Sequence, residues 1–328
     1  MEIKNQSRNN SIDVFKAFLL IFILTAHALP NAIPKVGSTA GVMFCLHLNS
    51  FSRLVVPIFF ILTGYFLRNR LLEKVYIVKY LKRLTILFVV WQLIYLKFNF
   101  TAYQNNFVTI ENFILDLFWG IAHLWYLNAT ILAVLFIFLI RNFKIKTKFI
   151  IAFFLLLLCY FLQILTKYQT AFEIDEFKQI LKYFGTERNF LFYGVPYILL
   201  GTLYENWKIQ VKKIDYLLIP LLILTVIESY FYIKLGRITF NIFITALPLS
   251  LILVNKVLQG NFKTSLKVNP TLPIGIYLCH FYAIYYVFGR FPSVPIELEI
   301  FKFLLICLIT IIFWFILDKI NKKIPYFF

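Results

Sequence analysis

Residues 11–30 read SIDVFKAFLLIFILTAHALP, and runs of this kind decide the fold of the chain. The segment is almost wholly apolar and long enough to cross the roughly 30 Å of hydrocarbon in a bilayer. Its apolar residues follow one another without alternation, which favours a helix over a strand of a membrane barrel. No small-residue cleavage site follows it, so we expect the segment to stay in the mature protein.

The rest of the chain has the same character. Of its 328 residues 61% are apolar and 15% are charged, and the mean hydropathy is +0.80. Soluble domains have roughly 45–50% apolar and about 25% charged residues, so a water-soluble fold is excluded. We predict an all-α, polytopic membrane bundle that forms one domain over residues 1–328. The ten predicted spans are 12–29, 51–67, 80–98, 124–140, 148–165, 189–205, 216–233, 238–258, 272–289 and 298–319.

The formal net charge of +18 would also fit a nucleic-acid-binding protein, so the placement of the charges decides its meaning. With a cytoplasmic N-terminus, 21 of the 33 Lys and Arg residues fall on the inner side and 11 on the outer side, and Lys16 lies within the first span. This positive-inside bias predicts that both termini are cytoplasmic. It also predicts that the basic residues contact membrane lipids and that the protein binds no nucleic acid.

Several kinds of site are excluded by the motifs. The four cysteines are scattered without paired spacing, which predicts neither a disulfide framework nor a metal site. The chain has no GxSxG, HExxH or Gly-rich phosphate loop, and we expect no permanently bound cofactor. Histidine is what remains for acid–base chemistry near neutral pH.

The first span carries ionisable residues that are costly in a membrane. Lys16 and His27 are eleven residues apart, close to three helical turns, so they share one face about 16 Å apart. Asp13 lies on the same stripe. Two plainer interpretations stay open: Lys16 as a flank residue that reaches the interface, and His27 as a helix-packing hydrogen-bonding group.

Further polar candidates flank other spans. The segment 68–83, RNRLLEKVYIVKYLKR, carries six basic residues that would attract a phosphate-bearing cofactor, although the positive-inside rule also accounts for them. His123 lies at the outer mouth of the fourth span, and Glu187 with Arg188 at that of the sixth. Segment 111–123 fits either an interfacial or re-entrant helix or an ordinary surface helix.

Two more ionisable residues lie within spans and receive no role from the sequence. They are His280, in the ninth span, and Glu228, a carboxylate deep in the seventh.

Five motifs, in order along the chain, resemble the acyltransferase family 3 of integral membrane proteins. The likeness covers most of the chain. The motifs are SIDVFKAFLLIFILTAH at 11–27, VVPIFFILTGYFL at 55–67, VKYLKRLTILFVVW at 78–91, HLWYL at 123–127 and IGIYLCH at 274–280. They are similar, respectively, to the family's Lys/Arg-to-His first helix, second-span signature, basic start of the third span, LWFL element and YLxH element.

The resemblance implies a multi-pass enzyme of the bacterial inner or plasma membrane. It would move an acetyl or other acyl group from acetyl-CoA to a hydroxyl of a surface or lipid-linked sugar. His27, with Lys16 and Asp13, would carry catalysis, and Lys79, Lys82 and Arg83 would bind the donor. The family's third-span pattern is Arg-x-x-Arg. Here the register is either Lys79-x-x-Lys82 or Tyr80-x-x-Arg83, and Lys lacks the bidentate phosphate contact of Arg.

On the outer side, the acceptor would contact a second group of residues. These are His123, Trp125, Glu187 and Arg188. A competing hypothesis is a flippase for a lipid-linked saccharide that performs no covalent chemistry. It predicts inverted repeats and matched Gly/Pro-broken helices, which the sequence lacks. A non-catalytic membrane scaffold gives no reason for Lys16 and His27 to share a helix face.

Overall fold

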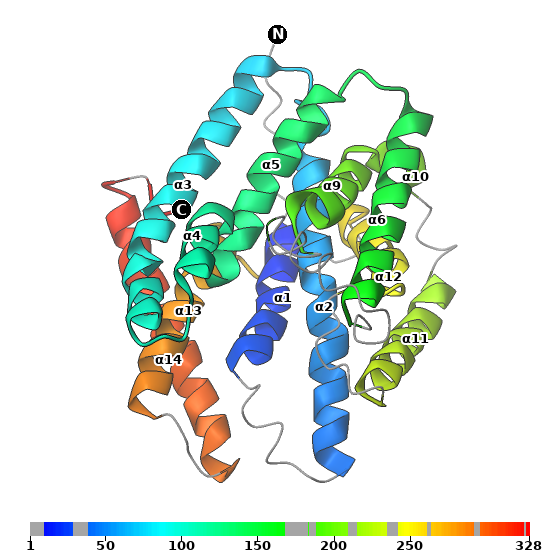
Figure 1. Cartoon of the computed structure of the whole chain (residues 1–328). Helices are drawn as coiled ribbons and strands as arrows, with labels where there is room; N and C mark the ends of the chain where they lie inside the picture. The colour runs from blue at the N-terminus through cyan, green and yellow to red at the C-terminus, as the bar shows by residue number, and fades with distance from the viewer. Residues whose placement is uncertain are drawn as a thin grey trace.

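A computed structural model describes residues 10–28, 39–167, 183, 188–208, 215–234, 242–260, 264–291, 296–324 and 326–328. Over these residues the chain is a bundle of helices without a strand (Figure 1). In the first half the elements are α1 (Asn10–Ala28), α2 (Thr39–Leu67), α3 (Lys74–Gln104), α4 (Ile110–Trp119), the 3₁₀ turn η2 (Ala122–Leu124), α5 (Trp125–Leu139) and α6 (Ile145–Lys167). In the second half they are the π-helical turn η3 (Phe190–Gly194), α9 (Val195–Thr202), α10 (Tyr204–Trp207), α11 (Asp215–Lys234), α12 (Ala246–Leu258), α13 (Leu272–Arg290) and α14 (Ile296–Asn321).

Seven of these helices are long and apolar enough to cross a membrane, where the sequence predicts ten spans. Their spanning segments are 10–28, 50–67, 74–104, 122–139 (η2 continued by α5), 145–165, 272–290 and 298–321. The other three predicted spans correspond to shorter apolar helices at 190–202, 216–232 and 246–258. A 13-residue helix such as α12 rises only about 20 Å, which is less than the bilayer core. The all-α membrane bundle is confirmed over the described residues, whereas ten spans and two cytoplasmic termini stay predictions.

Helix α9, within the sixth predicted span, is buried in protein on all sides. Every residue from Val195 to Gly201 is buried, and α9 packs most closely against α2. The two backbones meet at Gly64 and Gly201, where an added Cβ would collide with the carbonyl oxygens of Ile198 and Ile61. Small residues permit this close approach of helices. Because α9 is enclosed, a short and irregular segment here does not expose its backbone to lipid.

Helix α12 begins inside the bundle, and side chains satisfy the backbone that precedes it. Glu228 of α11 accepts hydrogen bonds from the backbone N–H groups of Ile244 (2.8 Å) and Thr245 (3.0 Å) and from the Thr245 hydroxyl (2.6 Å). Gln163 of α6 bonds both the N–H and the carbonyl of Ile242, each at 2.8 Å. Glu228 therefore has a structural role, as the cap that starts α12.

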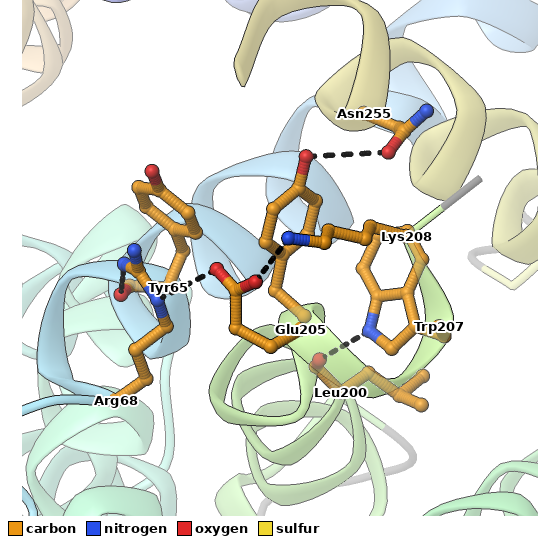
Figure 2. A network of polar contacts seen from close by, with 8 residues as sticks. Tyr65, Arg68, Leu200, Glu205, Trp207, Lys208 and Asn255 are labelled. Carbon is orange, nitrogen blue, oxygen red and sulfur yellow. Dashed lines mark hydrogen bonds and ion pairs between the residues drawn. The ribbon is translucent and has the colours of Figure 1, made fainter. Parts of the chain in front are cut away.

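A polar network joins the end of α2 to α10 and α12 (Figure 2). Arg68 lies 3.6 Å from a carboxylate oxygen of Glu205 and donates to the Tyr65 carbonyl at 2.6 Å, and Lys208 pairs with the same Glu205. The Tyr204 hydroxyl donates to Asn255 at 3.2 Å. These contacts account structurally for Arg68, one of the six basic residues in segment 68–83.

Candidate active site

Three of the four histidines of the chain meet inside the bundle. His27 comes from α1, His123 from η2 and His280 from α13. The His280 ring centre lies 5.4 Å from that of His27 and 4.8 Å from that of His123. The Phe281 ring lies within 5.0 Å of all three, stacked on His123. We call His27, His123 and His280 the histidine cluster; it brings together residues more than 250 positions apart in the chain.

The proton on His280 can be placed from its hydrogen bonds. Its Nδ1 atom lies 2.6 Å from the Tyr277 carbonyl oxygen and 3.2 Å from that of Ile276. A carbonyl oxygen only accepts, so Nδ1 carries the proton and Nε2 holds a free lone pair. His280 is 0% exposed, and Nε2 has no hydrogen-bond partner in the part of the chain that the structure describes. Such a buried lone pair is costly unless a ligand or a proton uses it.

His123 is held by the segment that leads into it. Gln92 of α3 donates to the carbonyls of Asp116 (3.2 Å) and Leu117 (2.8 Å) and accepts from the Ile121 N–H (3.0 Å). Asn128 of α5 donates to the Phe118 carbonyl at 3.0 Å.

The His123 ring itself is 5% exposed, and neither of its nitrogens has a hydrogen-bond partner among the described residues. Its backbone carbonyl accepts from the Tyr277 hydroxyl. The protein therefore fixes the backbone of His123 while leaving both ring nitrogens available.

Helix α4 covers most of segment 111–123, for which the sequence left two interpretations open. It is a ten-residue helix, capped by Thr109, with Ile110, Ile114 and Phe118 exposed and no buried residue. The absence of buried residues in α4 favours a helix on the surface of the bundle over a re-entrant one. Partial burial raises the pKa of the Asp116 carboxyl to about 6.

His27 differs from the other two members because it keeps accessible surface. Arg188 and Arg53 act on it electrostatically. Arg188 also lies over the Trp125 ring, at 5.7 Å from its centre. Two of the predicted acceptor-side residues, Trp125 and Arg188, therefore lie together, and Arg188 lies on the His27 side of the bundle.

A second site lies near the start of α3. A pocket of about 180 Å³ is lined by Lys79, Lys82, Arg83, Ile86, Leu87, Tyr326 and Phe328. The three basic residues are those predicted to bind the donor, and all three are exposed. Tyr80 is not a lining residue and packs against the main core. We call this site the basic pocket; it contains both basic residues of Lys79-x-x-Lys82 but only Arg83 of Tyr80-x-x-Arg83.

Helix α3 connects the two sites. Arg83 and Tyr95 are twelve residues apart, a rise of about 18 Å. Between them lies Trp91, which stacks on Tyr95 with ring centres 5.9 Å apart. Tyr95 contacts the His123 ring at 5.2 Å, and its hydroxyl donates to the Leu278 carbonyl at 2.7 Å, next to His280. The buried rings of Trp91 and Tyr95 thus lie on α3 between the basic pocket and the histidine cluster.

Comparison with known proteins identifies the family. The family model described as an acyltransferase domain matches residues 9–319, essentially the whole chain. The chain belongs to this acyltransferase family. None of the curated proteins and none of the solved structures compared matches it. The predicted family is confirmed, and the chain is a membrane acyltransferase by family and by its seven apolar helices.

The other residues predicted for the site lie as follows in the structure. The Lys16 Nζ lies 4.9 Å from the centre of the Phe66 ring, near the end of α2, and Lys16 is not among the residues that line the basic pocket. Asp13 is half-buried one turn before it on α1. The three residues predicted to bind the donor therefore share one pocket, whereas Lys16, predicted to act in catalysis, lies on another helix outside it. Glu187 lies outside the described residues.

Two residues of this candidate site were not given a role by the sequence. His280 was noted only as an ionisable residue within a span, and Arg53 was not singled out. Burial of a histidine within an apolar run was the signal for His280, whereas Arg53 precedes an apolar run in the manner of an ordinary flanking residue. The described residues contain no group of His, Cys, Asp or Glu that could hold a metal ion.

Proposed function

We propose that the protein is a membrane O-acyltransferase that moves an acetyl group from cytosolic acetyl-CoA to a hydroxyl of a cell-surface or lipid-linked sugar. The observation that carries the proposal is the histidine cluster, in which His123 and His280 have buried ring nitrogens without partners among the described residues, together with a pocket on α3 that holds three basic residues. A phosphorylated donor needs the second feature, and proton transfer in the membrane interior needs the first. The family supports acyl transfer and gives no support to the flippase hypothesis.

In the proposed mechanism, the phosphates of acetyl-CoA bind the basic pocket and the acyl group reaches the histidine cluster. The sugar hydroxyl oxygen attacks the thioester carbonyl carbon while His27 takes the hydroxyl proton. The new C–O ester bond forms, the C–S bond breaks, and His27 returns the proton to the thiolate, so that CoA leaves as its thiol. Proton transfer by a positioned side chain contributes about 10²–10⁴-fold in rate.

The other two histidines have supporting roles in this proposal. His280 holds its proton on the Tyr277 side, so its Nε2 lone pair is available to a hydroxyl or to the protonated His27. His123 supplies a ring whose position is set by Gln92 and Asn128 rather than by its own nitrogens. Arg188 and Trp125, which lie together, form the acceptor side, and Arg188 acts electrostatically on His27.

The test is the His27→Ala variant, assayed with acetyl-labelled acetyl-CoA in membranes that contain the acceptor glycan. We expect transfer of label to the glycan to fall at least about 100-fold, because the proton acceptor is lost. Thr25→Ala is the matched control, because Thr25 lies on the same helix and its hydroxyl donates to the Phe22 carbonyl at 3.0 Å. Normal acetylation by correctly inserted His27→Ala protein would overturn the assignment.

A further inference from the structure

The last residues of the chain pack against α3 beside the basic pocket. The Phe328 carbonyl accepts from Arg83 Nη2 at 3.0 Å, and the Phe327 carbonyl accepts from Trp91 Nε1 at 3.1 Å. The N–H groups of Phe327 and Phe328 both donate to Asn321 Oδ1, at 3.0 and 3.2 Å. Four hydrogen bonds to three side chains therefore hold this short segment, which we call the tail (residues 326–328).

The tail gives the basic pocket a second wall of different chemistry. Tyr326 and Phe328 line the pocket together with the three basic residues. Phe328 is 4% exposed and packs in the cluster that contains Leu87 and Trp91, so it is a fixed support. Tyr326 is 51% exposed, so its ring is available to a ligand. The pocket thus offers cations on one side and an open aromatic ring on the other.

We infer that the tail is part of the acyl-donor site and that Tyr326 receives the nucleoside of the donor while Lys79, Lys82 and Arg83 receive its phosphates. This inference rests on the proposed function. The adenine base of CoA has a flat face that stacks on an aromatic ring, and its phosphates need cations. A phospholipid headgroup would satisfy the same cations but has no ring for Tyr326, so the aromatic wall favours a phosphorylated nucleoside.

The tail also positions Arg83, one of the three basic residues of the pocket. The Phe328 carbonyl holds one end of the Arg83 guanidinium, which leaves its other N–H groups for a ligand. Asn321, at the end of α14, in turn holds the tail. Removal of the Asn321 amide should therefore weaken donor binding, although Asn321 does not line the pocket.

The experiment measures the Kd of CoA for the purified full chain in nanodiscs of phosphatidylcholine, by calorimetry. Tyr326→Ala should weaken CoA binding about tenfold, in the range of one lost base-stacking contact. Tyr326→Phe, which keeps the ring, should bind within about twofold of the natural chain. Asn321→Ala should weaken binding by a smaller factor. Ile324→Ala is the matched control, because Ile324 is 51% exposed, close to the tail, and does not line the pocket.

The possible outcomes separate the two levels of the proposal. Tight CoA binding that Tyr326→Ala and Asn321→Ala both leave unchanged would overturn the role of the tail and leave the proposed function standing. No CoA binding by the natural chain would overturn the acetyl-CoA donor, and with it the proposed function. CoA binding that phosphatidylglycerol nanodiscs abolish, and that Tyr326→Ala does not change, would identify a lipid headgroup site and overturn the inference. The inference is supported if Tyr326→Ala weakens CoA binding about tenfold while Tyr326→Phe and Ile324→Ala do not.

Discussion

The histidine cluster and the basic pocket differ in how far their polar side chains are buried. His123 and His280 are almost fully buried and have ring nitrogens without partners among the described residues. Lys79, Lys82 and Arg83 are exposed, and their charges are available from outside the bundle. Buried neutral imidazoles suit proton transfer, because no water competes for the lone pair, whereas exposed cations suit capture of an anionic ligand. In the proposed mechanism, the histidine cluster carries out the proton transfer and the basic pocket recognises the donor.

Of the three changes that test this comparison, removal of the His280 lone pair should have the largest effect. His280→Ala deletes both the fixed Nδ1–H and the Nε2 acceptor, and we expect kcat for acetyl transfer to fall about 100-fold with little change in the KM for acetyl-CoA. Steady-state kinetics with labelled acetyl-CoA measure both constants. Tyr285→Phe, on the exposed side of α13, is the control. A full kcat in the folded His280→Ala variant would remove His280 from the mechanism.

A smaller effect is expected from Gln92, which belongs to α3 but serves only the histidine cluster. Gln92→Leu leaves the carbonyls of Asp116 and Leu117 and the Ile121 N–H without this partner, so the segment before His123 should shift. We expect kcat to fall about tenfold while CoA binding is retained. Leu93→Ala, at the exposed neighbouring position, should leave both unchanged. Equal losses of kcat and of CoA affinity in Gln92→Leu would mean that the two regions are not separable.

The smallest effect should come from one charge of the basic pocket. Lys82→Gln should raise the KM for acetyl-CoA about fivefold with kcat nearly unchanged, since an exposed cation contributes about 1 kcal/mol to binding. The KM difference from the natural chain should shrink as salt screens the charge. Lys74→Gln, a basic residue of α3 outside the pocket, provides the comparison. A fall in kcat for Lys82→Gln at unchanged KM would contradict a recognition role.

Much of the fold was predictable because apolar runs can satisfy their backbone in lipid only as helices. All ten predicted spans overlap helices, and seven of those helices are long enough to cross a membrane. What periodicity cannot distinguish is a helix surrounded by lipid from one surrounded by protein. Residues 189–205 and 238–258 look like spans in sequence, yet α9 is enclosed by its neighbours and α12 starts late, at a cap built by Glu228.

The candidate site, like the fold, was predictable only in part from the sequence. The sequence by itself determined the membrane class, the family and the three donor-side basic residues as candidates, because composition, order of motifs and charge placement are properties of the chain alone. Only the tertiary structure decided that His280 joins His27 and His123, that Lys16 stands apart from the basic pocket, and that Tyr326 lines it. These are contacts between segments distant in sequence, and they depend on how the helices pack rather than on what each helix is.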